Sequence, residues 1–589
     1  MEGPGVQQLL DQATRHHQSG RLREAEMLYR QALSRQPDNA EALHLLGVLA
    51  GQVGRADAAQ ELIRRAIAIN PRDSEMHFNL GVNLSAAGKF DEAIASYRQA
   101  IGLQEDFAEA HSNLGHALRS KGALDEATGA YRKALALAPR LPQSHLNLAV
   151  ALHQNGKLAE AIAEYHAALA LHPNSPEILN NLGNCLLAIG DLAGAIDCLR
   201  QALALRPAYA EAHNNLGNAL KESGQFDQAI LSYRQAITLS PASASFHNNL
   251  GLAFREMGAL DQTIASHQQA LRLEPDNADA HYALAWVLLL RGEFAQGWRE
   301  FEWRRRRPTW QIQTQPFEQP HWEGQDLTGR RILLHAEQGL GDAIQFVRYA
   351  PVVARRGARV FLQCHAELGK LFADLPGIDG LTTRGDPLPP VDFLCPLMSL
   401  PGIFGTALAT IPTEVPYIRS DPANTERWRA RLAADPSRLK IGLVWAGRPG
   451  YSNDRRRSIS LKTLASLATV DGTQYYSLQK GPAAAQLADE PFGSRVIDLS
   501  ADLEDFADTA AALENVDLVI SVDTAVAHLA GAMGRPIWLL LPFAPDWRWL
   551  LGRDDSPWYP TMRLFRQPRP GDWDSAVRKM VEELSIWRR

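Results

Sequence analysis

The chain has 589 residues, and its 60 lysines and arginines against 66 aspartates and glutamates give a formal net charge of −6. This mild acidity argues against a nucleic-acid scaffold, because it implies no broad basic surface. The start, MEGPGVQQLLDQ, has no signal pattern, and no apolar run is long enough to span a bilayer. The four cysteines show no CxxC spacing, so neither a disulfide framework nor a zinc site is indicated. We therefore expect a soluble, cytoplasmic protein.

A strict 34-residue period runs through the first half of the chain. Glycines recur at this interval from Gly20 to Gly292, and alanines recur at it from Ala32 to Ala270. Prolines keep the same interval from Pro37 to Pro275, except where Glu105 stands. Small residues where two helices cross, a glycine turn and a closing proline at this period are typical of tetratricopeptide repeats. We predict an α-solenoid over residues 1–305, with about eight full repeats and a degenerate ninth.

One position in the first helix of these repeats is occupied by asparagine six times in succession. In a stacked array this position becomes a ladder of carboxamides, each of which offers a donor and an acceptor. A ladder that faces the groove would hold an extended peptide with little dependence on its side chains. Alternatively, the side chains only form hydrogen bonds between neighbouring helices. The candidate acceptor-binding residues are Asn79, Asn113, Asn147, Asn181, Asn215 and Asn249.

The hydrophobic pattern changes after a linker that we place at residues 306–330. Short apolar runs now alternate with helical stretches, which predicts parallel, doubly wound sheets. A Pro-rich, charged stretch near 411–436 divides the strands into two groups. We predict two nucleotide-binding-type lobes, at 331–420 and 421–589, with ligands at the carboxyl ends of the strands. The expected strands are RILLHAE, RVFLQC, VDFLC, KIGLVW, YYSLQ, RVIDL, DLVISV and PIWLLL.

The first informative turn is HAEQGLGDAIQF, at residues 335–346. Gly339 and Gly341 allow a tight turn from strand to helix. A dinucleotide-binding fingerprint needs a third glycine where Ile344 stands, so an NAD site is only weakly indicated. Asp342 begins the following helix. It is either an ordinary first-turn carboxylate or a general base for an acceptor hydroxyl.

The second informative turn is SVDTAVAHLAGAMGRP, at residues 521–536. An apolar strand runs into Asp523 and Thr524 and then into a helix of small residues. This exposes backbone amides at a helix N-terminus, where anions bind. His528 lies one turn further, within reach of a phosphate or a sugar. From the residues alone we favour the plainer interpretation, in which Asp523 caps the helix and His528 packs within it.

Together, GLGD and DTAVAHLAGAMGRP resemble the ADP-heptose:lipopolysaccharide heptosyltransferase family, whose members are glycosyltransferases of the two-lobed GT-B fold. EQGLGDAIQFVRYAP, DTAVAHLAG and DWRWLLGRDDSPWYP also resemble bacterial proteins that fuse tetratricopeptide repeats to such a transferase. The resemblance covers essentially the whole chain. It implies a solenoid followed by an α/β GT-B fold with two Rossmann-like lobes, and an inverting transferase that uses a nucleotide sugar as co-substrate with no cofactor and no metal. The first lobe is shorter than in the heptosyltransferases.

The resemblance also implies roles for individual residues. Asp342 becomes the catalytic base, and Gly341 shapes its turn. Two cations are candidates to contact the donor phosphates: Lys480, in YYSLQKG, and Arg448, after KIGLVW. Each is alternatively a solvated surface charge, and for Arg448 we favour that alternative. The further donor-binding residues are Asp523, Thr524, Ala525 through its backbone amide, and His528.

Leaving-group stabilisation by helix amides and a lysine needs no metal. No convincing DxD metal motif lies among the strand turns. Asp572 and Asp574, in GDWDSAV, are expected to begin the last helix.

Two aromatic and basic segments each have two interpretations. EFEWRRRRP, with Arg304 to Arg307, suggests nucleic-acid binding, but the overall acidity favours an interdomain contact or a solvated helix end. WRWLLGRDDSPWYP, at residues 547–560, either stacks a nucleobase or packs one lobe on the other.

The order of repeats and transferase also resembles that of the O-GlcNAc transferase of protein modification. We therefore expect a soluble transferase that moves a sugar to a Ser or Thr hydroxyl of a protein held in the repeat groove. Bacterial proteins of this layout make flagellin a candidate acceptor and a nonulosonic acid a candidate sugar. The donor nucleotide is left open among UDP, ADP, GDP and CMP. The alternatives are a lipopolysaccharide- or glycan-type transferase whose repeats serve assembly, and a non-catalytic adaptor.

Overall fold

The computed structural model describes residues 4–140, 142–308, 310, 319–432, 438–449 and 454–587. Contacts between residues divide the chain into two compact units, Met1–Leu239 and Ser240–Arg589. Each unit is considered separately below. Part of the linker predicted at 306–330 lies outside the described residues. Among the described residues, no helix has the length and apolar character that crossing a membrane requires.

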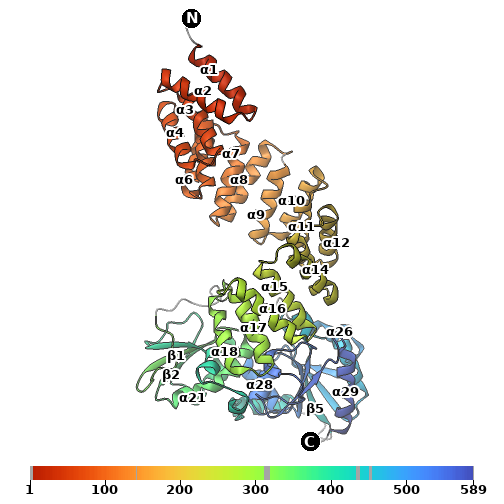
Figure 1. The fold of residues 1–589 in the computed structure, drawn as a ribbon. Helices are drawn as coiled ribbons and strands as arrows, with labels where there is room; N and C mark the ends of the chain where they lie inside the picture. The colour runs from red at the N-terminus through yellow and green to blue at the C-terminus, as the bar shows by residue number, and fades with distance from the viewer. Residues whose placement is uncertain are drawn as a thin grey trace. The chain divides into compact units, whose positions relative to one another are not determined.

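The first unit consists of helices that form successive pairs, each joined by a short turn. The pairs follow one another in chain order (Figure 1). Within each pair the two helices make the most extensive contacts of the unit. The helices are α1 Val6–Gln18, α2 Leu22–Arg35, α3 Ala40–Gln52, α4 Ala56–Ile69, α5 Ser74–Ala86, α6 Phe90–Leu103, α7 Ala108–Ser120, α8 Leu124–Leu137, α9 Pro142–Gln154, α10 Leu158–Leu171, α11 Pro176–Ile189, α12 Leu192–Leu205, α13 Ala210–Glu222 and α14 Phe226–Leu239.

The periodic glycines and alanines explain how these pairs form. Each pair turns at a glycine with positive φ, such as Gly88 at +73°, a conformation that other residues rarely adopt. The periodic alanine of each second helix, such as Ala100, is completely buried. A second glycine brings the helices together, because a Cβ on Gly81 would lie 2.6 Å from the Tyr97 ring. The packing predicted from the 34-residue period is confirmed.

The second unit begins with two more helix pairs. The ninth pair, predicted to be degenerate, keeps a full first helix and a second helix of 8 residues that continues into a 3₁₀ helix. These elements are α15 Ala244–Glu256, α16 Leu260–Leu273, α17 Ala278–Leu290, α18 Phe294–Phe301 and η1 Glu302–Arg306.

The rest of the second unit contains two parallel sheets, as predicted. The first has the order β3-β2-β1-β4, with β1 Arg331–His335, β2 Arg359–Cys364, β3 Gly380–Thr383 and β4 Phe393–Pro396. The second has the order β10-β9-β8-β5-β6-β7, with β5 Leu439–Val444, β6 Thr473–Ser477, β7 Val496–Asp498, β8 Leu518–Val522, β9 Ile537–Leu541 and β10 Met562–Arg566. Below, the first lobe means residues 331–420 and the second lobe residues 421–589.

The eight expected strands are all present, whereas β3 and β10 are not among them. Both lie at a sheet edge, where a strand needs less apolar character. The sequence of β3, GLTT, is half polar, and that of β10, MRLFR, contains two arginines. Neither forms the continuous apolar run by which a buried parallel strand is recognised.

Helices and 3₁₀ helices connect the strands. In the first lobe these are α20 Leu340–Phe346, η2 Val347–Tyr349, α21 Ala350–Ala354, η3 Ala366–Leu368, α22 Gly369–Phe372, η4 Leu397–Ser399, α23 Leu400–Ile403 and η5 Leu408–Thr410. In the second lobe they are α24 Pro422–Arg431, α25 Asp454–Arg457, η6 Leu461–Thr469, η7 Pro482–Ala485, α26 Gln486–Asp489, η8 Pro491–Arg495, α27 Phe506–Glu514, α28 Ala525–Ala532, η9 Trp547–Trp549 and α29 Trp573–Ile586. Asp572 caps α29 by accepting the Ser575 N–H at 3.2 Å, as its predicted helix start requires.

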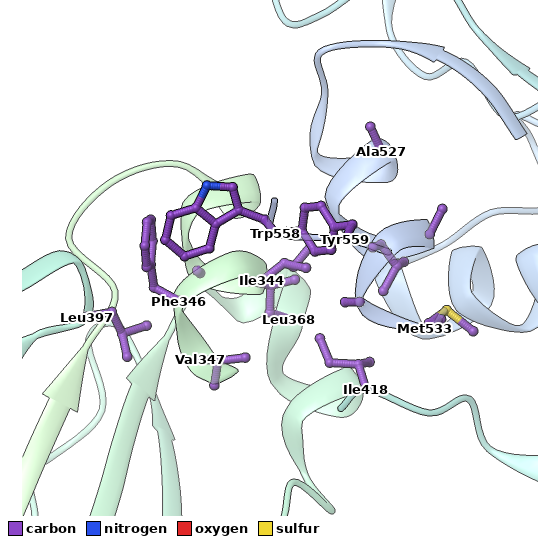
Figure 2. Packing of buried hydrophobic residues seen from close by; sticks show 14 of the residues in the cluster. Ile344, Phe346, Val347, Leu368, Leu397, Ile418, Ala527, Met533, Trp558 and Tyr559 are labelled. Atoms are coloured by element: carbon purple, nitrogen blue, oxygen red, sulfur yellow. The ribbon is translucent and has the colours of Figure 1, made fainter. Parts of the chain in front are cut away.

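One hydrophobic core joins α17 and α18 to both lobes. Figure 2 shows Ile344 and Phe346 of the first lobe close to Trp558 and Tyr559 of the second. The Phe346 and Trp558 ring centroids are 5.8 Å apart, at an interplanar angle of 77°. Trp547, Trp549 and Trp558 are at most 1% exposed. Of the two interpretations of segment 547–560, the structure therefore supports the packing of one lobe on the other.

Candidate functional site

Each sheet has one point where the order of its strands reverses, between β1 and β4 in the first lobe and between β5 and β8 in the second. In open parallel sheets, ligands bind beyond the carboxyl ends of the strands at such points. The turn after β1 leads to Asp342, and the turn after β8 leads to Asp523 and Thr524. Both turns singled out in the sequence therefore lie at a reversal point.

The helices that follow these two turns, α20 and α28, pack directly against each other. A Cβ on Gly341 would lie 2.8 Å from His528 Cδ2 and 3.5 Å from Ala525 Cα. Gly341 lies inside α20 and is not among the glycines with positive φ. The requirement for glycine here is therefore the close approach of the two lobes, and not the backbone conformation of a turn.

Asp342 combines a capping role with an ion pair. Its Oδ2 accepts the Gly339 N–H at 3.0 Å, which caps the first turn of α20. Its Oδ1 accepts a hydrogen bond from Arg548 of the second lobe. The side chain keeps 22% of its surface exposed. The plain first-turn role is thus present, and the carboxylate is also tied to the opposite lobe.

Arg548 is a site residue that the sequence reasoning missed. It lies in η9, and its side chain is only 7% exposed. Its Nη1 donates to Asp546 at 2.9 Å and its Nε donates to Gln345 at 2.6 Å. Burial would lower the pKa of this guanidinium, but Asp546 and Asp342 raise it, so Arg548 stays charged. The sequence signal was weak because this arginine stands between two tryptophans of a packing segment.

Asp523 and His528 lie in a buried network. Asp523 Oδ2 accepts the Trp549 Nε1–H at 2.9 Å, and its Oδ1 is 3.7 Å from His528 Nε2. His528 Nδ1 is 2.9 Å from the Tyr559 hydroxyl. Burial acts to raise the pKa of Asp523, but the interactions with His528 and Trp549 hold it below its ordinary value. These side chains orient one another, which leaves the backbone amides at the start of α28 as the groups suited to an anion.

Thr524 and Ala525 begin that helix. Thr524 is the N-cap residue and makes no side-chain cap hydrogen bond; its Oγ1 lies 3.1 Å from Ser521 Oγ. Ala525 is the first helical residue, so its amide lies in the first turn, where α-helical N–H groups lack intrahelical partners. The structure therefore brings Asp342, Gly341, Asp523, Thr524, Ala525 and His528 into one region.

The two predicted cations lie in other surroundings. Lys480 follows β6, which is next to the reversal point and not at it. Its Nζ donates to the carbonyls of Ser500 at 2.8 Å and Leu503 at 2.7 Å. Arg448 is exposed and makes no ion pair with any residue that the structure describes. For Arg448 this matches the alternative of a solvated surface charge.

Arg457 is a further cation that the sequence reasoning missed. It belongs to α25, in the connection that follows β5 at the reversal point. A Cβ on Gly447 would lie 2.9 Å from Arg457 Nη2, so the guanidinium rests against the backbone after β5. Its charge also contributes to lowering the pKa of Asp523. The only sequence signal for this residue is the basic run NDRRRS. Its relevance to the site follows from its position after β5, at the reversal point.

The candidate peptide ladder lies on the first helices of the pairs, with its side chains partly exposed. Asn79 Nδ2 is 2.9 Å from His44 Nε2, and Asn215 Nδ2 donates to Asn180 at 2.9 Å. These two contacts bridge neighbouring first helices, as the alternative interpretation requires. Two ladder residues accept hydrogen bonds within their own helices, Asn147 from Gln143 and Asn181 from Asn180. Asn113 forms no side-chain hydrogen bond among the described residues. Asn249 also interacts with another residue.

The basic segment at the end of the repeats contacts the first lobe. Arg304 is 1% exposed, and its Nη2 donates to Glu337 at 3.1 Å and to Ser399 at 2.7 Å. Its Nη1 donates to Glu302 at 2.6 Å. For Arg304, the structure thus supports the interdomain contact. Glu337 lies between β1 and Asp342, so this network links the last repeat to the candidate site.

No group of three or more histidine, cysteine, aspartate or glutamate side chains suited to hold a metal occurs in the described part of the chain.

Several known proteins are similar to part of this chain. Protein FlbA of Caulobacter vibrioides is 30% identical over 341 residues, which cover 51% of this chain and 54% of that protein. The chain thus spans about half the length of this curated relative. Among solved structures, one of MamA is 30% identical, covering 28% of this chain and 96% of that chain, with a TM-score of 0.26. YrrB, described as a TPR protein with an unusual peptide-binding site, is 21% identical, covering 32% and 96%, with a TM-score of 0.27.

Family models match the repeat region. Residues 16–80 match the model described as tetratricopeptide repeat, and residues 85–118 match the model described as TPR repeat. Residues 105–307 match the model described as cilia and flagella-associated protein 70 C-terminal domain. Together with the helix pairs and their glycine turns, these matches show that the chain contains tetratricopeptide repeats.

Proposed function

We propose that this protein is a GT-B glycosyltransferase that moves a sugar from a nucleotide to a Ser or Thr hydroxyl of a protein acceptor. The observation that carries the proposal is the contact between α20 and α28 at Gly341 and His528. It places a carboxylate beyond β1 of one parallel sheet next to a helix N-terminus beyond β8 of the other. A base and an anion site on opposing lobes suit transfer from a nucleotide sugar, whose leaving group is a phosphate.

The proposed step is a direct displacement. Asp342 accepts the proton of the acceptor hydroxyl, and the hydroxyl oxygen forms a bond to the anomeric carbon. The bond between that carbon and the phosphate oxygen breaks, and the nucleotide leaves with the electron pair, as a diphosphate from a UDP, ADP or GDP donor and as a monophosphate from a CMP donor. The amides at the start of α28 and the guanidinium of Arg457 would stabilise the new charge on the leaving phosphate. Lys480 would contribute only after its ammonium leaves the carbonyls of Ser500 and Leu503.

A protein acceptor is supported by how closely the last repeats pack on the lobes. Trp298 Nε1 donates to the Thr406 carbonyl of the first lobe at 2.8 Å. Arg456 of the second lobe lies 2.6 Å from Glu256 at the end of α15. Tetratricopeptide arrays suit extended protein segments, so a segment on these last repeats would be held beside the candidate site. Flagellin as the acceptor and a nonulosonic acid as the sugar stay predictions that rest on the resemblance.

A non-catalytic adaptor is the second candidate. It is favoured by the pairing of Asp342 with Arg548 and by the commitment of the Lys480 ammonium to backbone carbonyls. Both contacts occupy groups that a transferase would use. A lipopolysaccharide- or glycan-type acceptor has no comparable observation in its favour.

The test is calorimetric binding of UDP, GDP, ADP and CMP to the full chain. We expect one nucleotide to bind and Arg457→Ala to weaken its binding by about tenfold to a hundredfold, on the order of 1.4–3 kcal/mol. Arg569→Ala is the matched control, because this arginine is 81% exposed and pairs only with Asp572 among the described residues. Its binding should equal that of the unaltered chain.

Transfer is then measured with the sugar conjugate of the bound nucleotide and with flagellin plus Ser/Thr peptides as acceptors. Asp342→Ala should bind the nucleotide normally and lower kcat by about 10²–10⁴-fold, the usual contribution of a general base. Replacement of Asn113, Asn147, Asn181 and Asn215 by Ala should raise the acceptor KM, whereas Asn155→Ala and Asn174→Ala, outside the ladder, should not. A folded chain that binds none of the four nucleotides would overturn the proposal in favour of the adaptor.

A further inference from the structure

Arg548 is the point where the two lobes meet at the candidate base. It comes from the second lobe, and it contacts Asp342 and Gln345 of α20 in the first lobe. Its Nη1 and backbone N–H both bond Asp546 Oδ1, at 2.9 and 3.0 Å, which anchors it in its own lobe. The guanidinium lies 4.5 Å from the Trp547 ring centroid and 5.5 Å from that of Phe346. The guanidinium is thus held by hydrogen bonds to acceptors of both lobes and by contact with aromatic rings of both lobes.

The contacts of Asp342 leave room for a substrate. An ionised carboxylate has about four lone-pair positions. The Gly339 N–H uses one on Oδ2, and Arg548 uses one on Oδ1. About two positions remain, and 22% of the side chain is exposed. Arg548 therefore fixes the direction of the carboxylate without filling it.

We propose that Arg548 is the positioning residue of Asp342, and this rests on the proposed function, in which Asp342 takes the acceptor proton. Asp546 holds Arg548, and Arg548 in turn holds Asp342. The Gly339 N–H holds Oδ2 from within the first lobe, whereas Arg548 and Asp546 belong to the second lobe, so Oδ1 is held only while the lobes are packed together. The guanidinium suits this task because its donors form a rigid planar fork.

The test measures kcat, acceptor KM and nucleotide Kd for full-length variants. Kd is measured with the nucleotide identified by calorimetry. Transfer is measured with the sugar conjugate of that nucleotide as donor and with flagellin plus Ser/Thr peptides as acceptors. We expect Arg548→Ala to lower kcat by about a hundredfold, the order of loss for a misplaced catalytic group. The nucleotide Kd should stay within threefold, about 0.7 kcal/mol. Arg548→Lys, which keeps the charge without the fork, should recover part of kcat, and Asp546→Asn should lower kcat in the same sense.

Arg348→Ala is the matched control. Arg348 of the first lobe is 5% exposed and also joins the lobes, because it donates to the Trp558 carbonyl of the second lobe. Within its own lobe it donates to the Pro412 carbonyl and the Tyr417 hydroxyl. These contacts do not include Asp342. Its loss should lower the thermal midpoint at least as much as Arg548→Ala and leave kcat nearly unchanged at a temperature where the variant is folded.

The double variant Asp342→Asn with Arg548→Ala decides between positioning and an independent role. A residue that acts through Asp342 adds no further loss once Asp342 is neutral. Losses that multiply, or a kcat for Arg548→Ala equal to that of the unaltered chain, would overturn the inference while the proposed function stands. An unaltered chain that binds no nucleotide and transfers no sugar would overturn both. If Arg548→Ala fails to fold, Arg548→Lys and Asp546→Asn carry the same comparison.

Discussion

His267 occupies a position of the second helices that five other repeats fill with tyrosine. His267 is fully buried and packs against Gly251, where an added Cβ would lie 2.7 Å from the imidazole ring. Its Nδ1 is 2.9 Å from Asn248 Oδ1. Burial, with a smaller effect of Arg255, lowers the pKa of His267 from 6.5 to about 3. A packing position of the repeat therefore holds a side chain whose ordinary pKa lies near neutral pH.

This histidine predicts an acid-sensitive second unit. The unfolded chain binds the imidazole proton below pH 6.5, whereas the folded chain does not bind it until about pH 3. Stability therefore rises with pH across this window and is lost as the pH falls, by up to about 2 kcal/mol between pH 6.5 and pH 5. We expect His267→Tyr to reduce the drop in thermal midpoint between pH 7.5 and pH 5. The same drop in both proteins would contradict the prediction.

Gly341 sets the distance between the two lobes at the candidate site. Gly341→Ala should cost about 1–3 kcal/mol, because its Cβ would meet His528 at 2.8 Å. It should also reduce nucleotide binding, since α20 would be pushed from the start of α28. Gly129→Ala in α8 is the control: its Cβ meets nothing within 4 Å, so the helix should gain about 0.5–1 kcal/mol. Urea unfolding measures both changes, and equal effects would contradict the packing argument.

At the scale of elements, η1 joins the repeats to the first lobe through a buried ion pair. Glu337 is buried, which raises its pKa, and Arg304 counters this shift. Removal of one partner of such a pair leaves an uncompensated charge, whereas replacement of both costs less. The element therefore depends on a polar network as well as on the apolar contacts of α18.

We expect Arg304→Met to destabilise the second unit by about 3–5 kcal/mol. The double variant Arg304→Met with Glu337→Gln should recover a large part of this loss, because no buried carboxylate is then unpaired. Chemical unfolding of the two variants measures the difference. A double variant that is as unstable as Arg304→Met would show that packing, and not charge, dominates here.

At the scale of the whole molecule, contacts divide the chain near residue 239, within the run of repeats. The sequence placed a domain boundary at residue 305, where the 34-residue period ends. Helices α17 and α18 share one core with the lobes, and Trp298 and Phe301 are 4% and 1% exposed. The last repeats therefore continue the repeat series in the sequence and also contribute side chains to the hydrophobic core of the lobes.

This division predicts which fragments fold. A fragment of residues 240–589 should be monodisperse, unfold cooperatively and keep the nucleotide binding of the full chain. A fragment of residues 306–589 should aggregate, because it exposes the apolar surface that α17 and α18 cover and leaves Glu337 without Arg304. Size-exclusion chromatography and calorimetry compare the two. A well-folded 306–589 fragment would support the boundary placed from the sequence.

The repeats and the two parallel sheets were predictable from the sequence because both depend on local patterns. A glycine such as Gly88 sets a turn wherever it stands, and an apolar run such as LVISV forms a buried strand. The turns that carry Asp342 and Asp523 were found in the same way, because each follows such a strand. Their donor and acceptor roles stay predictions.

The partners of these residues were decided only by the tertiary structure. Arg548 is 206 residues from Asp342 in the chain, and no local pattern relates them. Arg457 gains its place from the reversal of strand order between β5 and β8, and Arg304 gains its place from a lobe that begins after it. The local periodicity thus determined the elements, whereas the pairing of charges across the lobes followed from how the sheets and the last repeats pack together.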